Sequence, residues 1–154
     1  MGAAYFYHLT RRPLEATLPM LLSRAGAAGW RVVVRGRRDD HLAWLDEKLW
    51  LGPEEEFLPH GLAGGPHDAR QPVLLTSASD VPEGAACLMC VDGAEVSAEE
   101  VAALERVCVL FDGHDPEALS RARGQWRSLT EAGAAAQYWS EESGRWEKKA
   151  ESGA

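Results

Sequence analysis

The sequence has no apolar stretch near the roughly 20 residues that an α-helix needs to cross a bilayer. Its first residues, MGAAYFYHLTRRP, carry their basic side chains after the apolar ones, the reverse of the order in a secretory signal. It has only three cysteines, an odd number that does not suit a disulfide framework. We therefore expect a cytoplasmic protein with reduced thiols and no membrane partner.

Positive charge is also scarce. The chain has 16 lysines and arginines against 24 aspartates and glutamates, a formal net charge of -8. Tight DNA binding without sequence preference needs a basic surface that displaces counterions, so we expect any contact with DNA to be indirect. The length of 154 residues and the 45% hydrophobic content suit one domain with a real core.

Motifs for phosphate binding and nucleophilic catalysis are missing. The chain contains no GxxxxGK followed by Ser or Thr, and its first β-prone run leads into Thr10-Arg11-Arg12-Pro13, which has no glycine. It also contains no GxSxG. These absences predict a protein without a cofactor and without catalytic residues, and therefore not an enzyme.

Metal binding is disfavoured by spacing. Cys87 and Cys90 have the CxxC spacing, but on a strand residues three apart point to opposite faces and cannot share a metal ion or a disulfide. His60 and His67 do not complete a standard zinc pattern with them. We predict that the cysteines belong to a buried strand, that His60 is a loop histidine, and that the protein holds no metal.

Strands and helices alternate along the chain. We predict strands at 4–9, 30–34, 72–76, 87–91 and 106–111, and helices at 14–28, 40–51, 97–104 and 115–129, the first interrupted or started by Pro19. Asp39 or Asp40 would cap the second helix, and Ser97 and Glu100 have capping-box spacing. Apolar strands without polar alternation indicate a mostly parallel sheet covered on both faces. The prediction is a single-domain α/β protein, a Rossmann-like three-layer fold over 1–148, with a flexible tail at 149–154.

The stretch from 45 to 65, LDEKLWLGPEEEFLPHGLAGG, is unusual for a loop. Gly52-Pro53 ends the preceding helix, and large apolar residues then lie among three consecutive glutamates: Trp50, Phe57, Leu58, Pro59 and Leu62. Apolar side chains in such a loop either pack under their own domain or contact a partner.

A second feature is basic. Arg123 and Arg127 are four residues apart on the last predicted helix and so lie on one face, beside Trp126. One interpretation is a solvated face with Trp126 in the core. The other is a groove with an apolar floor and guanidinium groups, which would suit a peptide that ends in an aromatic residue and a free carboxylate.

The stretch from 45 to 65 resembles the signature of the chi subunits of bacterial DNA polymerase III, which are accessory proteins of the clamp loader. The matching residues are Leu45-Asp46-Glu47, Leu49-Trp50, Pro53, Phe57, Pro59-His60 and Leu62-Ala63-Gly64. The opening AYFYHL, the segment GWRVVV and the C-terminal ARGQWRSLTEAG are also similar to the family. The resemblance implies a non-catalytic subunit of the polymerase holoenzyme that acts in DNA replication.

The resemblance also implies two contact surfaces. The acidic C-terminal tail of single-stranded-DNA-binding protein would bind at Arg123, Trp126 and Arg127. The psi subunit of the clamp loader, an equivalent partner or a helicase-like repair protein would bind at Trp50, Phe57 and Pro59. Two positions depart from the family pattern of the tail site: Asp112 replaces an apolar residue and Leu119 replaces a basic one.

Two other functions stay open. One is a small α/β enzyme or nucleotide-binding protein, which a deep polar pocket at the carboxyl ends of the strands would favour. The other is a helicase-associated repair adaptor that acts through Trp50 and Phe57.

Overall fold

The computed structural model describes residues 2–10, 14–50, 60–62, 73–77, 84–141 and 146–152. Its elements, in chain order, are β1 (Ala3–Leu9), α1 (Leu14–Ala27), β2 (Val32–Arg35), α2 (Asp39–Trp50), β3 (His60–Leu62), β4 (Val73–Thr76), β5 (Cys87–Cys90), α3 (Ala98–Ala103), β6 (Arg106–Asp112), α4 (Pro116–Glu131), β7 (Ala136–Ser140) and β8 (Glu147–Ser152). None of the helices described is long and apolar enough to cross a membrane.

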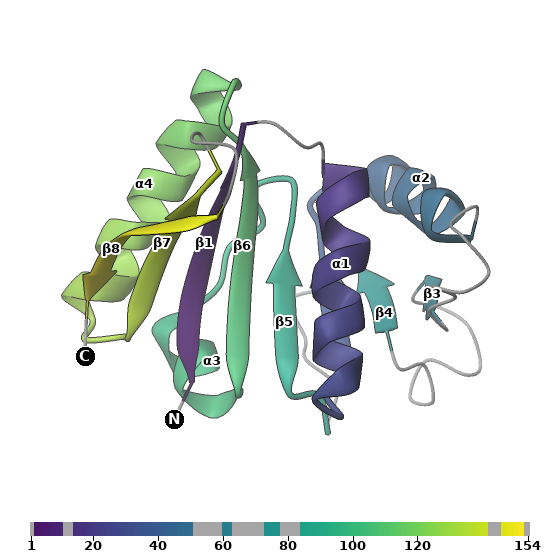
Figure 1. Cartoon of the computed structure of the whole chain (residues 1–154), viewed down its shortest axis with the longest axis horizontal. Helices are drawn as coiled ribbons and strands as arrows, with labels where there is room; N and C mark the ends of the chain where they lie inside the picture. The colour runs from purple at the N-terminus through teal and green to yellow at the C-terminus, as the bar shows by residue number, and fades with distance from the viewer. Residues whose placement is uncertain are drawn as a thin grey trace.

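The strands form one eight-stranded sheet in the order β3-β4-β2-β5-β6-β1-β7-β8 (Figure 1). Neighbouring strands are parallel except for the antiparallel pair β7 and β8. Helices α1 and α2 pack against one face, and α3 and α4 pack against the other. The predicted α/β fold, a mostly parallel sheet with helices on both faces, is confirmed.

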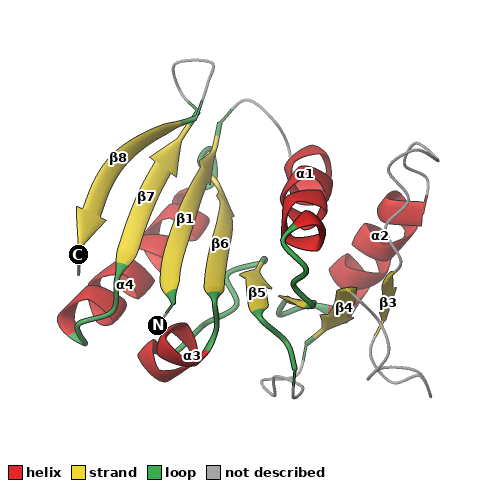
Figure 2. Ribbon diagram, turned by 60° about the horizontal axis from the view of Figure 1, so that its bottom comes forward, coloured by secondary structure: helices red, strands yellow, loops and turns green. Residues whose placement is uncertain are grey.

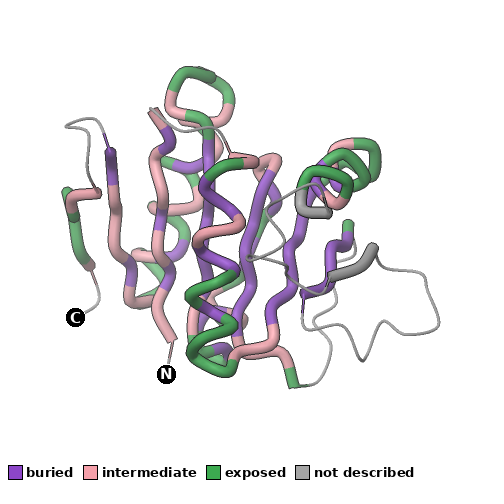
Figure 3. The backbone as a smooth tube through the Cα atoms, turned by 45° about the vertical axis from the view of Figure 1, so that its right-hand side comes forward, coloured by how far each residue is buried: buried purple, intermediate pink, exposed green. Residues whose placement is uncertain are grey.

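Two hydrophobic clusters, one on each face, explain why the central strands lack polar alternation. On β2, Val32 and Val34 pack under α1 and α2, whereas Val33 faces the α3 side. Every residue of β2, β4 and β5 is buried (Figure 3). Successive residues of a strand point to opposite faces, so a strand that is covered on both faces needs apolar residues at odd and even positions alike. The sequence has them.

The helix starts follow local sequence signals. Ser97 and Glu100 form the predicted capping box of α3, and the Asp115 carboxylate accepts hydrogen bonds from the backbone N–H groups of the first turn of α4. Asp39 and Asp40, predicted as alternative caps of α2, lie instead in its first turn. Pro19 lies inside α1, so that helix continues through it.

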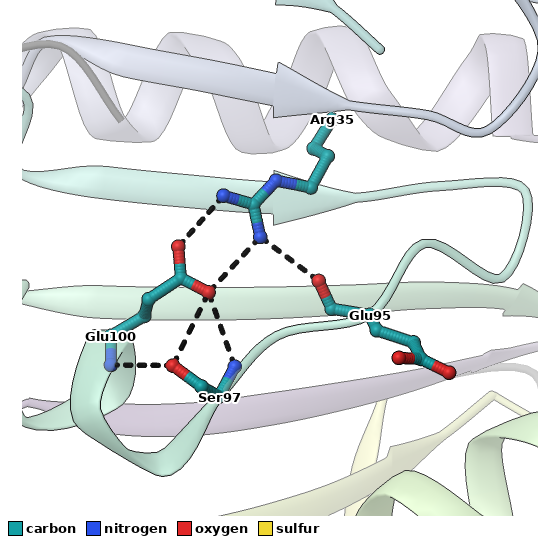
Figure 4. A network of polar contacts seen from close by, with 4 residues as sticks. All are labelled: Arg35, Glu95, Ser97 and Glu100. Atoms are coloured by element: carbon teal, nitrogen blue, oxygen red, sulfur yellow. Dashed lines mark hydrogen bonds and ion pairs between the residues drawn. The ribbon is translucent and has the colours of Figure 1, made fainter. Parts of the chain in front are cut away.

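Arg35, the last residue of β2, ties helix α3 to the sheet (Figure 4). Its side chain lies in the interior, and the residue is only 5% exposed. The Arg35 guanidinium donates to both carboxylate oxygens of Glu100, at 2.7 and 3.1 Å, and to the Glu95 carbonyl at 2.9 Å. Glu100 also closes the capping box with Ser97. One carboxylate therefore fixes both the start of α3 and its position over the sheet.

Three strands were not predicted. β3 begins at His60, so the interpretation of His60 as a loop residue is wrong. β7 and β8 extend the sheet beyond β1, with β8 at its edge (Figure 2). β8 has the sequence EKKAES and is largely exposed. It has no hydrophobic pattern from which a strand could be predicted. Its charged side chains suit the unpaired edge of a sheet. The domain boundary at 148 stays a prediction, and the structure continues β8 across that position to Ser152.

Candidate functional site

A groove of about 570 Å³ lies beside α4 at the carboxyl end of β1. Four parts of the chain line it: β1 and the residue after it, the turn between β6 and α4, the exposed side of α4, and β7. Its lining residues are His8, Thr10, Gly113, His114, Leu119, Arg123 and Tyr138. We call it the α4 groove.

The floor of the α4 groove is built by close contacts between β1 and the β6–α4 turn. The Gly113 N–H donates to the Leu9 carbonyl at 2.7 Å, and the His8 ring stacks on Phe111 with centroids 5.3 Å apart. A Cβ atom at position 113 would collide with the His8 ring and would lie 2.9 Å from the Leu9 carbonyl oxygen. Only glycine fits at position 113 without a shift of β1 or of His8.

The rim is held by the same turn. The Asp112 carboxylate accepts the His114 N–H at 2.8 Å, and a ring nitrogen of His114, Nε2, lies 2.7 Å from the Thr10 carbonyl oxygen. As a donor to that carbonyl, His114 ties the start of α4 to the end of β1. Asp112 thus has a local role in shaping the turn.

Arg123, Trp126 and Arg127 all lie on α4, but they differ in what they contact. Arg123 is exposed and lines the groove. Arg127, one turn further on, is exposed and is not part of the lining. The half-buried Trp126 packs on the core, with its ring edge-on to Tyr138 at 6.1 Å. Trp126 therefore supports a wall of the groove from behind.

The groove combines apolar surface with positive charge. Leu119 and Tyr138 supply an aliphatic and an aromatic wall, and Arg123 supplies a permanent cation. A guanidinium binds a carboxylate by charge-assisted hydrogen bonds, which are stronger than neutral ones. This combination suits a short peptide segment with an apolar side chain next to a carboxylate.

Sequence reasoning missed His8, Thr10 and Tyr138. His8 belongs to the predicted first strand, where a polar residue in an otherwise apolar and aromatic run was the available signal. Tyr138 lies on β7, which was not predicted. These residues meet α4 only because β1 lies between β6 and β7 in the sheet.

The second predicted surface falls mostly outside the described residues. Trp50 is the last residue of α2, and its side chain is not described. Phe57 and Pro59 lie outside the described ranges. Their contact with a partner stays a prediction.

The cysteines behave as strand residues. Cys87 packs in the cluster under α1, and Cys90 packs in the cluster on the opposite face, as predicted. Burial raises the pKa of the Cys90 thiol to about 12. Among the described residues, no three histidine, cysteine or acidic side chains are grouped in a way that could hold a metal ion.

Comparison with known proteins gives a consistent result. The family model described as "DNA polymerase III chi subunit, HolC" matches residues 1–137. The chain is also similar to the probable DNA polymerase III subunit chi of Rickettsia prowazekii (strain Madrid E), with 20% identity over 111 residues, which are 69% of this chain and 67% of the relative. The matched range includes α4 and stops one residue before Tyr138.

Proposed function

The chain belongs to the DNA polymerase III chi subunit family, and we propose that it is a non-catalytic accessory subunit that links the clamp loader to single-stranded-DNA-binding protein. In this role it acts in the cytoplasm and contacts DNA only through its protein partners. Its net charge of -8 supports an indirect contact, because direct binding to the phosphate backbone needs an excess of positive charge.

The observation that carries the proposal is the α4 groove. The C-terminal tail of single-stranded-DNA-binding protein would place its terminal carboxylate on Arg123 and its aromatic side chain against Leu119 and Tyr138. Arg127 would add long-range attraction for the acidic part of the tail. Trp126 would act through the position of Tyr138.

A second contact would join the chain to the clamp loader. We assign it to the psi subunit or an equivalent partner at Trp50, Phe57 and Pro59, and a helicase-like repair protein is the alternative partner for the same residues. Large apolar side chains in an acidic segment suit a surface that is covered in a complex.

Coupling through two contacts does not need a tight tail interaction. A peptide contact with a Kd on the order of micromolar corresponds to about 8 kcal/mol. Tethering within one assembly turns that contact into an intramolecular one and increases the overall avidity. Because the carboxylate pairs with an exposed arginine, the affinity should fall as the salt concentration rises.

Titration calorimetry with an acidic peptide that ends in an aromatic residue and a free carboxylate tests the proposal. The full chain is compared with Arg123→Ala, with Arg127→Ala and with Arg24→Ala, which removes an exposed arginine at the far end of α1 as a control. Binding that weakens in Arg123→Ala, persists in Arg24→Ala and falls when the peptide carboxylate is amidated supports the proposal. Absence of peptide binding at low salt would contradict the proposal that the α4 groove binds the tail.

A further inference from the structure

A larger hollow, of about 930 Å³, lies along the carboxyl ends of the central strands β1, β2, β5 and β6. α1 leaves β1 toward one face of the sheet, and α4 leaves the neighbouring strand β6 toward the other. In open α/β sheets, ligands bind where adjacent strands send their helices to opposite faces. We call this hollow the switch-point crevice. It is of the size of a small-molecule site.

Two arginines from distant parts of the chain converge in the switch-point crevice. Arg37 follows β2 and Arg121 lies on α4, and both approach Gly93 in the turn after β5. A Cβ atom at position 93 would lie 2.8 Å from Arg121 Cδ and 3.6 Å from Arg37 Nη1. The absence of a side chain at Gly93, where φ is 74°, leaves space for the two side chains to lie together.

The guanidinium groups of the crevice are largely available. Within the described part of the chain, Arg37 and the neighbouring Arg38 have no carboxylate partner, and Arg121 has only a long contact of 3.4 Å with the exposed Glu117. Arginine pairs close together repel each other unless an anion lies between them. A phosphate is the anion whose geometry fits two guanidinium forks.

Most carboxylates of the crevice already have partners. Asp92 pairs with His41, Asp112 accepts the His114 N–H, and Asp115 caps α4. Glu117 contacts Arg121, which leaves Glu15 as the remaining carboxylate of the lining. The lining holds three arginines and five carboxylates, so positive charge is concentrated only locally, where Arg37 and Arg121 meet at Gly93.

Asp92 contributes a buried carboxylate to the crevice. It adopts a φ of 57° in the turn with Gly93, in the left-handed region that aspartate enters more readily than most residues other than glycine. Its side chain is only 7% exposed, and among the described residues its Oδ2 atom has no hydrogen-bond partner. A buried carboxylate oxygen needs a hydrogen-bond donor. A ligand hydroxyl would supply one.

Part of the remaining lining is apolar. The crevice is also lined by Leu9, Leu14, Leu110, Phe111, Ala118 and Ala122. A ligand that satisfies all of these groups carries a phosphate, at least one hydroxyl and a flat or apolar body.

We propose that the switch-point crevice binds a nucleoside monophosphate, with its phosphate between Arg37 and Arg121, a ribose hydroxyl at Asp92 and its base against the apolar wall. The chain has no glycine-rich phosphate loop, so side chains bind the phosphate here in place of backbone N–H groups. Thr10 and His114 line both the crevice and the α4 groove, so the two sites adjoin.

Calorimetric titration of the full chain with AMP, adenosine and inorganic phosphate tests this proposal. We expect saturable AMP binding that weakens about tenfold in Arg37→Gln and in Arg121→Gln, which is the loss of one charge-assisted hydrogen bond. The exposed Arg24 on α1 gives the matched control, and Arg24→Gln should bind AMP as the wild type does. Thermal unfolding of each variant checks that the fold is intact.

Four outcomes would overturn the proposal. Adenosine that binds as well as AMP would exclude a phosphate site, and inorganic phosphate that binds as well as AMP would exclude recognition of the nucleoside. AMP affinity that is equal in the wild type and all variants would exclude the crevice as the binding site. Absence of AMP binding to the wild type would exclude it as well. None of these titrations uses the tail peptide, so absence of AMP binding would leave the proposed adaptor function unchanged. Absence of tail-peptide binding would likewise leave the proposed AMP site unchanged.

Discussion

The ring of Trp126 on α4 meets the ring of Phe6 on β1 edge to face, with centroids 5.4 Å apart and planes at 78°. Phe6 is fully buried, so this contact anchors the middle of α4 to the central sheet. The sequence left open whether Trp126 is a core residue or a floor of a groove. The structure gives it a packing role, while Arg123 and Arg127 on the same helix are exposed.

Replacing Trp126 by alanine should lower the free energy of unfolding by about 2 to 4 kcal/mol, somewhat below the usual cost for a large buried aromatic side chain because Trp126 is only half-buried. Urea denaturation followed by circular dichroism measures the change. Trp126→Phe keeps most of the ring contact and should lose less than half as much. A loss of equal size in both variants would contradict the edge-to-face contact as the source of the stability.

Gly113→Ala should destabilise the protein by about 1 to 3 kcal/mol, since the new methyl group overlaps the His8 ring and crowds β1. Gly124→Ala is the matched control on α4, because a Cβ atom there would meet no described residue within 4 Å. That second substitution should stabilise the helix by about 0.5 to 1 kcal/mol. The two alanine substitutions should therefore shift the urea midpoint in opposite directions. Shifts in the same direction would show that position 113 is not closely packed against His8 and β1.

The pair of Arg35 and Glu100 predicts an acid dependence of stability. The hydrogen bond from Arg35 holds the pKa of Glu100 below its usual value of 4.5. The contribution of ionised Glu100 to the free energy of unfolding is therefore complete above pH 4.5. It is lost as the pH falls through the lowered pKa of Glu100 in the folded state. Glu100→Gln should cost about 3 kcal/mol at neutral pH, because the buried Arg35 loses its carboxylate, and should flatten the stability curve in this acid range.

Glu99→Gln is the control for that experiment, since Glu99 is exposed in the same turn of α3. It should change the unfolding free energy by less than about 0.5 kcal/mol. Chemical denaturation between pH 3 and pH 7 gives both curves. An unchanged acid slope in Glu100→Gln would contradict the assignment.

The two arginines of α4 should differ in the tail-peptide titration. Arg123 lines the α4 groove and Arg127 does not, so Arg123→Ala should lower the affinity by about tenfold, as expected for a lost charge-assisted hydrogen bond. Arg127→Ala should lower it by only about twofold to threefold, as for an exposed charge, and raised salt should abolish that smaller effect. A larger loss of affinity in Arg127→Ala than in Arg123→Ala would place the carboxylate site one turn further along α4.

The three cysteines should be unreactive in the native protein. All are buried, and burial raises the pKa of the Cys90 thiol to about 12, so little thiolate forms near pH 8. Ellman's reagent at pH 8 should therefore detect the thiols in denaturant and detect almost none of them without it. Rapid labelling of native protein would mean that β5 or β6 opens locally.

Much of the fold was predictable from local patterns. The apolar run at 32–34 indicated a strand covered on both faces, and Ser97, Glu100 and Asp115 marked the starts of two helices. Such signals depend on backbone hydrogen bonding and burial within a few residues. β8 could not be predicted in this way, since EKKAES is stabilised as an edge strand by its pairing with β7.

The sequence by itself determined the α/β class, the family and the presence of two arginines on one face of the last helix. The tertiary structure decided which of them lines a groove and which other residues line it: His8 and Tyr138 share the groove with Arg123 because β1 lies between β6 and β7. It also decided that Arg37 and Arg121, 84 positions apart (121 minus 37), converge at Gly93. Strand order places these side chains together, and it depends on packing between distant segments, which local periodicity does not encode.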